Sequence, residues 1–165
     1  MLTDTLCTRC GLCCDGTLFG DVELSGPKES ARLEVLGLDV DTDDADAELL
    51  ALPCGGLRGT RCSVYAHRPQ CCRTFECRLL QEARRGVVTT ELALVRIAEA
   101  RVQLRRVKAL LSKMEARPVR LPLAERVADA ITSTATGSAA VRHRKTVLET
   151  AMGALTRTIR TTFLD

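Results

Sequence analysis

The chain has 165 residues, enough for one domain with a hydrophobic core or for a small metal module followed by helices. It contains one Tyr, three Phe and no Trp, so its composition favours helices over sheets and disfavours a base-stacking surface for nucleic acid. The formal net charge of +3 divides unevenly, because residues 1–77 carry seven Lys or Arg against 13 Asp or Glu, while residues 78–165 carry 17 against eight.

No stretch of the chain reaches the roughly 18 apolar residues that a membrane span needs. The N-terminus has no basic segment followed by an apolar run, so no secretory signal is expected. We therefore expect a cytoplasmic protein. The chain also has no glycine-rich phosphate loop and no recognisable catalytic set, which leaves open whether it is an enzyme.

The first cysteine cluster lies close to the N-terminus. Cys7, Cys10 and Cys13 are each separated by two residues, which suits a chain that wraps an iron–sulfur cluster and takes a fourth ligand from elsewhere. Structural Zn²⁺ sites more often use two separate cysteine pairs, so the spacing favours iron–sulfur, with 4Fe-4S ahead of Zn²⁺. Cys14 directly follows Cys13, so its side chain points elsewhere, either to a second metal or into packing. An odd number of cysteines and no export signal disfavour a disulfide framework.

The segment between the two cysteine groups predicts short elements. Alternating apolar residues in 17–24 favour a short strand, and Pro27 opens a helix over 27–36 that ends before Gly37. The aspartates of 39–46 lack the glycine and the closing glutamate of a calcium-binding EF-hand loop, so a solvated loop is expected.

The second cysteine group follows a predicted hairpin over residues 57–65 that turns at Gly59. Pro69 suits the first turn of a helix that carries Cys72 and ends near Cys77. Such a hairpin and helix would gather Cys54, Cys62, Cys72 and Cys77 in one sulfur-rich corner. A site shared with the first cluster is equally compatible with the spacing.

These residues carry a resemblance to a known family. The chain is similar to the YkgJ-like cysteine-cluster family of zinc- or iron-chelating proteins in its ordered motifs Cys7-x-x-Cys10-Gly11-x-Cys13-Cys14 and Cys62-x-Val64-Tyr65-x-x-Arg68-Pro69-x-x-Cys72-Arg73-x-Phe75-x-Cys77. The resemblance covers residues 7 to about 85. It implies a metal-ligating set of Cys7, Cys10, Cys13, Cys14, Cys54, Cys62, Cys72 and Cys77. Cys71 lies outside the pattern, and an exchange of register between Cys71 and Cys72 stays open.

Four other residues of the motif are expected to surround and contact the metal cofactor. Arg68 and Arg73 can offset the charge of clustered thiolates and donate to sulfur or to backbone carbonyls. Tyr65 and Phe75 are predicted to form a lid that keeps water from the metal site.

After Cys77 the chain contains no cysteine and reads as amphipathic helices. The expected helices cover 78–85, 91–117 with Thr90 as its cap, 123–134 and 139–163. Their apolar stripes are Leu94, Ile97, Leu104, Val107, Leu111 and Met114 in the second, and Val141, Leu148, Leu155 and Thr162 in the last. The two long helices, 91–117 and 139–163, are predicted to form an intramolecular hairpin or, less favoured, a dimer interface.

The predicted fold class is mostly α: a small cysteine-rich metal-binding module with a short β-hairpin over 1–85, followed by a C-terminal helical hairpin or bundle over 86–165. The predicted function is a metal-binding, redox or structural module that docks a protein partner, or a second copy, through the basic C-terminal helices. The alternatives are a metal-dependent enzyme with an open coordination position and a metal- or redox-responsive regulator. A regulator would bind duplex DNA, but no convincing helix-turn-helix is present, so nucleic acid is disfavoured.

Overall fold

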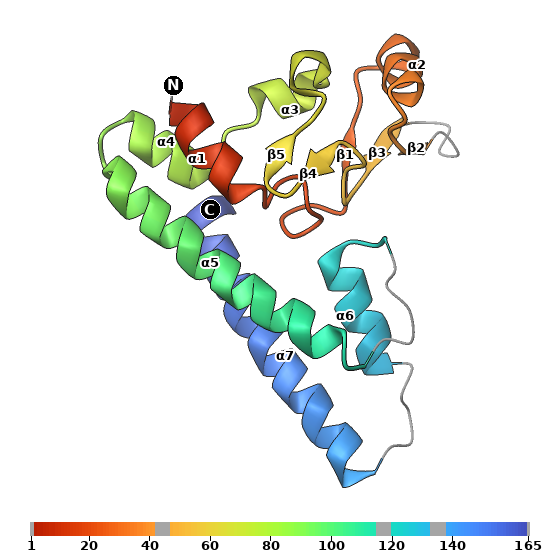
Figure 1. Cartoon of the computed structure of the whole chain (residues 1–165), viewed down its shortest axis with the longest axis vertical. Helices are drawn as coiled ribbons and strands as arrows, with labels where there is room; N and C mark the ends of the chain where they lie inside the picture. The colour runs from red at the N-terminus through yellow and green to blue at the C-terminus, as the bar shows by residue number, and fades with distance from the viewer. Residues whose placement is uncertain (1, 42–46, 115–119, 133–137, 165) are drawn as a thin grey trace.

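The computed structural model describes residues 2–41, 47–114, 120–132 and 138–164. The fold is mostly helical, with a small β region in its N-terminal part and long helices in its C-terminal part, which confirms the predicted fold class (Figure 1). The described α-helices are α1 (Leu2–Cys10), α2 (Pro27–Val35), α3 (Gln70–Thr74), α4 (Arg78–Arg84), α5 (Thr90–Leu111), α6 (Leu123–Thr132) and α7 (Ala139–Ile159). A short 3-10 turn, η1 (Tyr65–His67), precedes α3, and a π-helical turn, η2 (Arg160–Leu164), follows α7.

The strands form two small antiparallel sheets. The first has the order β1 (Asp21–Glu23), β3 (Leu49–Ala51) and β2 (Val40–Asp41), with Val22 and Val40 both opposite Leu50. The second is the hairpin of β4 (Leu57–Arg58) and β5 (Arg61–Cys62). The hairpin and the strand near residue 22 were predicted, whereas β2 and β3 were not.

A small hydrophobic core holds the three-stranded sheet to α2. Its buried members are Leu24, Leu33, Leu38 and Leu50. Gly26 and Pro27 start α2, and the chain leaves the helix at Leu36, as the sequence predicted to within one residue.

A larger core joins α1 and α4 to the C-terminal helices. Helices α5 and α7 run side by side in opposite directions (Figure 1), with α5 contributing Ile97, Leu104 and Val107 and α7 contributing Leu148 and Leu155. The predicted stripe of α5 therefore faces this intramolecular core, with Leu94 and Met114 half-buried at its edge. Of the predicted α7 stripe, Leu148 and Leu155 face the core, whereas Val141 and Thr162 are half-buried and do not belong to it. Leu6, Leu12 and Leu79 of the cysteine-bearing half belong to the same core.

Several predicted boundaries were wrong in detail. Thr89, not Thr90, caps α5, because its side chain accepts a hydrogen bond from the Leu92 N–H at 3.2 Å. Pro69 is the N-cap of α3 and not part of its first turn, and α3 already ends at Thr74. Cys77 is the N-cap of a separate helix, α4.

Some predictions fall on positions outside the described residues. These are the central part of the acidic loop (42–46), the end of the helix predicted over 91–117 and the last two residues of the helix predicted over 123–134. Of the described helices, none has the length and apolar character needed to cross a membrane.

Candidate metal centre

All nine cysteines line one cavity of about 780 Å³. The cavity is bounded by α1, the β4–β5 hairpin, α3 and the start of α4, and every one of the nine thiols is free of a disulfide. The two groups that are 40 residues or more apart in the sequence therefore face a common space.

The first group is held by the end of α1 and the turn after it. Cys7 and Cys10 lie on α1, and Gly11 reverses the chain with φ +71° before Cys13 and Cys14. The turn closes with a hydrogen bond from the Cys14 N–H to the Gly11 carbonyl at 3.1 Å. The Cys13 and Cys14 sulfurs lie 3.8 Å apart and line the same cavity, so the prediction that the Cys14 side chain points away from Cys13 was wrong.

The second group approaches the first through the backbone. The Cys54 N–H donates to the Cys14 carbonyl at 2.9 Å, which fixes the loop after β3 against the first cluster. Cys62 lies on β5 opposite Leu57, and Cys72 lies on α3. The Thr60 hydroxyl, at the hairpin turn, donates to the Thr8 carbonyl of α1 at 2.5 Å. Hairpin and helix α1 are thus fastened to each other on one side of the cavity.

Cys77 lies with the first group. Together with Cys10 it packs against the larger core, and the charges of Cys13 and Cys77 both act on the thiols of Cys7 and Cys10. Cys54 and Cys71 instead pack against the smaller core under the sheet. The cavity therefore lies between the two cores, with a set of thiols on each side.

Burial favours the neutral form of several thiols of the cavity. Burial, followed by the charges of Cys13 and Cys77, raises the pKa of Cys7 to about 11, and burial is also the main cause that raises the pKa of Cys10 to about 12. Burial likewise raises the pKa of Cys54, Cys72 and Cys77, although the Leu79 and Leu80 N–H groups oppose it at Cys77. Since a thiolate is the ligand form, binding a metal cation here must release protons.

The Cys13–Cys14 pair behaves differently from the other thiols. The hydrogen bond between the two sulfurs, together with burial, raises the pKa of Cys14 well above its ordinary value, while the same hydrogen bond lowers the pKa of Cys13. One proton can therefore be shared between these two sulfurs.

Cys71 and Cys72 face different neighbours. The thiol of Cys72 is influenced by Cys13 and Cys54, whereas apart from Cys72 the charge that acts on Cys71 is that of Glu29. Cys71 also packs against the smaller core. The placement thus sets Cys72 nearer the other thiols, while the choice of ligand between the two stays a prediction.

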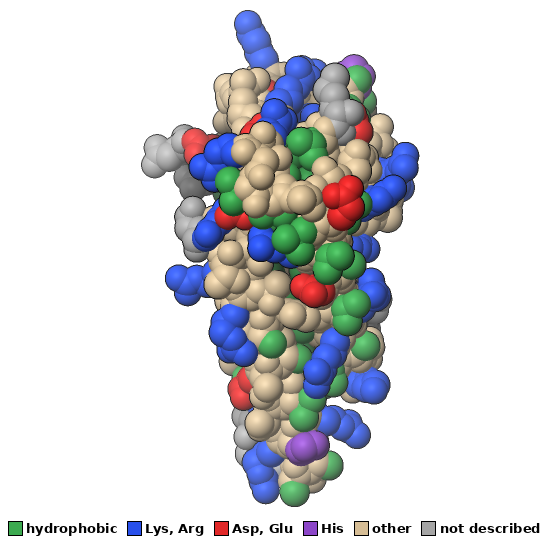
Figure 2. Space-filling model, turned by 90° about the vertical axis from the view of Figure 1, so that its left-hand side faces the viewer, with side chains coloured by type: hydrophobic (Ala, Val, Ile, Leu, Met, Phe, Trp, Pro, Cys, Tyr) green, Lys and Arg blue, Asp and Glu red, His purple; other side chains and the backbone are tan. Residues whose placement is uncertain are grey.

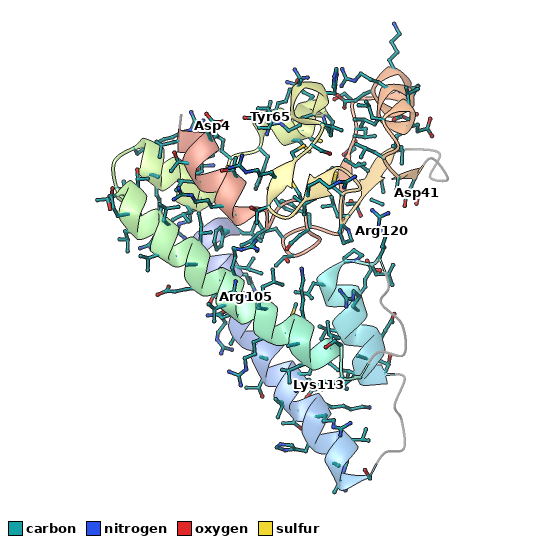
Figure 3. All side chains as sticks on the ribbon, viewed as in Figure 1. Asp4, Asp41, Tyr65, Arg105, Lys113 and Arg120 are labelled. Atoms are coloured by element: carbon teal, nitrogen blue, oxygen red, sulfur yellow. The ribbon has the colours of Figure 1, made fainter. Side chains whose placement is uncertain are left out.

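The four predicted cofactor-contacting residues also line the cavity. The Arg68 guanidinium stacks on the Tyr65 ring at 3.9 Å from its centroid (Tyr65 is labelled in Figure 3). Its charge opposes the rise in the pKa of Cys7 and adds to the hydrogen bond from Cys14 that lowers the pKa of Cys13. Arg73 instead donates from Nε to the Arg68 carbonyl at 2.7 Å and from Nη2 to the Ala66 carbonyl at 3.0 Å. Arg73 thus fixes the backbone that carries Arg68.

The aromatic wall has a member that the sequence did not reveal. Phe19 meets Phe75 edge to face, with ring centroids 5.1 Å apart, and both rings line the cavity. The available signal was that Phe19 is one of only four aromatic residues and follows the first cysteine cluster closely. Tyr65 and Phe75 are 48% and 40% exposed, so both stand at the mouth of the cavity, where the predicted lid would lie.

Other residues that position the thiols carry no sequence signal. Glu29 accepts a hydrogen bond from the Gln70 N–H at 2.9 Å and so ties α2 to the start of α3. The Arg101 Nη1 of α5 donates to the Cys10 carbonyl at 2.6 Å. Arg120 reaches the Pro53 carbonyl, next to Cys54, at 3.5 Å (Figure 3).

The donor set fits a thiophilic metal. Within the described residues no three His, Cys, Asp or Glu side chains are already drawn together closely enough to hold an ion. The structure supplies nine soft sulfur donors on one cavity, which is the ligand chemistry of iron–sulfur clusters and of structural Zn²⁺.

The comparison with known families agrees with this donor set. A family model described as "CxxCxxCC: Putative zinc- or iron-chelating domain" matches residues 6–94, more than half of the chain. The chain belongs to this family, and its membership supports metal binding. No curated protein and no solved structure matches the chain. The matched segment extends into the first turn of α5, and the division of the chain at residue 85 stays a prediction.

Proposed function

We propose that the chain holds a [4Fe–4S] cluster through Cys7, Cys10, Cys13 and Cys77, and acts as a redox or structural module. The observation that carries the proposal is the position of Cys77 among the first group of thiols. Three cysteines spaced by two residues, joined by one distant cysteine, form the four-thiolate set that binds such a cluster.

The remaining patterned cysteines form a second set in this proposal: Cys14, Cys54, Cys62 and Cys72. Their support is the hydrogen bond between the Cys54 and Cys14 backbones and the packing of Cys54 against the smaller core. Four thiolates suit tetrahedral Zn²⁺ as well as a second cluster. The proposal places the protein in the cytoplasm, since a reducing compartment keeps nine thiols available for metals.

The metal is identified by anaerobic purification, followed by an absorption spectrum and analysis of iron, sulfide and zinc. A brown protein that absorbs at about 400 nm and contains about four iron and four sulfide ions per chain would support the proposed [4Fe–4S] cluster. A colourless protein that contains zinc alone, purified anaerobically, would contradict it.

The two sets are separated by serine substitutions. We expect Cys77→Ser to remove the chromophore and leave the metal of the second set, while Cys62→Ser does the reverse. Cys71→Ser is the matched control and should leave both metals in place. If Cys77→Ser and Cys62→Ser each remove all metal from a folded protein, the thiols form one polynuclear site.

Two observations favour an enzyme as the second candidate. The cavity of about 780 Å³ lies within the size range of small-molecule sites, and apolar side chains form much of its wall. The buried Arg68 Nε has no hydrogen-bond partner, so it is available to an anionic group in the cavity. A change in the electron paramagnetic resonance spectrum of the reduced, metal-loaded protein on adding cyanide would indicate an open coordination position. An unchanged spectrum would disfavour the enzyme.

A further inference from the structure

The outer face of α5 carries an exposed apolar seam. Val95, Val102 and Ala109 are seven residues apart and so lie in one line along the helix, and all three are exposed. Val95 and Val102 are 51% and 55% exposed, and Leu92 beside them is 45% exposed. This seam points away from the larger core, whose α5 members are Ile97, Leu104 and Val107 among others.

A row of charged side chains follows the seam. Glu99, Arg106 and Lys113 are also seven residues apart and exposed, so they lie along one side of the seam, acidic first and basic later. No ion pair joins any of these three side chains to another described residue. Figure 2 shows the side of the molecule on the left of Figure 1, with hydrophobic side chains exposed beside acidic ones and Lys or Arg below them.

We propose that two copies of this chain pair through this face of α5, antiparallel and centred on Val102. The charge order is the reason for the direction of pairing. In the antiparallel arrangement Val102 meets its own counterpart, Val95 lies opposite Ala109, and Glu99 lies within one helical position of Arg106 of the second copy. A parallel pair would instead set Glu99 beside Glu99 and Arg106 beside Arg106.

The twofold symmetry doubles every contact of the seam except that of Val102 with its own counterpart, which lies on the symmetry axis. Each copy contributes the same surface, so the Glu99–Arg106 pair forms twice and Glu91 comes opposite Lys113 twice. Lys113 lies just beyond the end of α5 (Figure 3). Ala98 and Ala109, both exposed, leave room for the two helix backbones to approach. A single pair of 22-residue helices gives a small interface, so we expect a dimer in the micromolar range.

Charge-reversal variants test this pairing in the metal-loaded, full-length protein. Glu99→Arg sets two like-charged Arg pairs in the dimer, and Arg106→Glu sets two Glu pairs, so each variant should dimerise at least about tenfold more weakly than the wild type. An equimolar mixture of the two variants restores both opposite-charge pairs. We therefore expect the mixture to form heterodimers with an affinity close to that of the wild type, measured by sedimentation velocity over a range of concentrations.

The outcomes are distinct. Both altered residues are exposed, so unchanged helical circular dichroism and metal content confirm that each variant is folded. Restoration of dimers in the mixture supports the proposal. A wild-type chain that stays monomeric at several hundred micromolar would overturn it. So would a wild-type dimer that neither variant weakens, because that dimer would use another surface. Loss of metal binding in the serine variants above bears on the proposed function and leaves this test unaffected.

Discussion

Glu29 joins two elements that are far apart in the sequence. Its carboxylate accepts hydrogen bonds from the N–H groups of Ser25 and Gln70, both at 2.9 Å. Burial alone would raise the pKa of Glu29, but these two hydrogen bonds, together with the charge of Arg32 and the Ser25 side chain, outweigh burial and hold the pKa below its usual value. The ionised carboxylate is therefore the form that fastens α3, with Cys71 and Cys72, to α2.

We predict that Glu29→Ala lowers the free energy of unfolding by about 1–2 kcal/mol at neutral pH, because a hydrogen-bonded carboxylate is lost. Because the folded-state pKa is depressed, the stabilisation is complete above the unfolded value of about 4.3 and disappears as the pH falls through the folded-state pKa. Urea unfolding at a series of pH values measures the difference. Glu34→Ala, at an exposed position of the same helix, is the control. A difference from wild type that persists unchanged in acid would contradict this role.

Gly11 is required by two independent constraints. Its φ is +71°, and a β-carbon placed on it would lie 3.1 Å from the Thr60 Cα, which is backbone and cannot turn aside. Gly59, in the hairpin turn, has a similar φ of +62° but open space around it. Both glycines adopt the left-handed conformation, but only Gly11 has a close neighbour. Substitutions at the two positions therefore distinguish the cost of the backbone conformation from the cost of the close contact.

We predict that Gly59→Ala destabilises the protein by about 1–2 kcal/mol, from the left-handed conformation alone. Gly11→Ala should destabilise it further and reduce metal content, because the contact between the cysteine turn and the hairpin is forced apart. Thermal unfolding and metal analysis of the two variants provide the comparison. Equal effects of the two substitutions would show that the approach of Thr60 is unimportant.

At the scale of elements, the start of α5 distinguishes two adjacent threonines. The Thr89 side chain accepts the hydrogen bond from the Leu92 N–H, while Thr90 is already within the helix. We predict that Thr89→Ala lowers the free energy of unfolding by about 1 kcal/mol, as expected for loss of an N-cap. Thr90→Ala should have a clearly smaller effect in the same chemical denaturation experiment. A larger loss of stability for Thr90→Ala than for Thr89→Ala would instead identify Thr90 as the N-cap.

Patterns of short range were enough to predict many of the elements. Gly59 and Pro27 mark a turn and a helix start, and the apolar stripes of α5 and α7 follow from a helical period. Strands β2 and β3 were missed because each has only two or three residues, and β3 is recognisable only by pairing with β1, more than 25 positions earlier. Thr89 and Thr90 are chemically equivalent as caps, so only the backbone geometry selects one.

The candidate site was predictable as a set of residues and not as an arrangement. Cysteine spacing and the family motif select eight of the nine cysteines as ligands, and the structure places all nine on one cavity, while the choice of ligands stays a prediction. Spacing could not assign Cys77 to the first group, because that depends on α4 packing beside α1 in the larger core. The roles of Arg101 and Glu29 were also not predicted. The sequence does not indicate that a charged residue on a helix will bond to a backbone carbonyl or N–H far away in the chain.

At the scale of the whole molecule, the C-terminal helices brace the first cysteine cluster. Besides the bond from Arg101 to the Cys10 carbonyl, Lys108 of α5 pairs with Asp15 at 3.3 Å. The Leu123 N–H, at the start of α6, donates to the Gly16 carbonyl at 2.8 Å. Leu12 between these points is fully buried in the core that α5 and α7 share. Metal binding and packing of the long helices should therefore depend on each other.

We predict that removing the metal destabilises the long helices together with the cysteine-bearing half. A metal present at about 1,000 times its dissociation constant adds about 4 kcal/mol of stability, equivalent to roughly 10 °C in Tm for a chain of this size. Melting curves of metal-loaded and chelator-treated protein, followed by helical circular dichroism, measure the shift. Because α5, α6 and α7 together contribute most of the described helix, that signal reports mainly on the half without cysteines. A single transition that moves down on metal removal supports the coupling. Two transitions, with the helical one unmoved, would instead show that residues 86–165 fold as a unit independent of the metal centre.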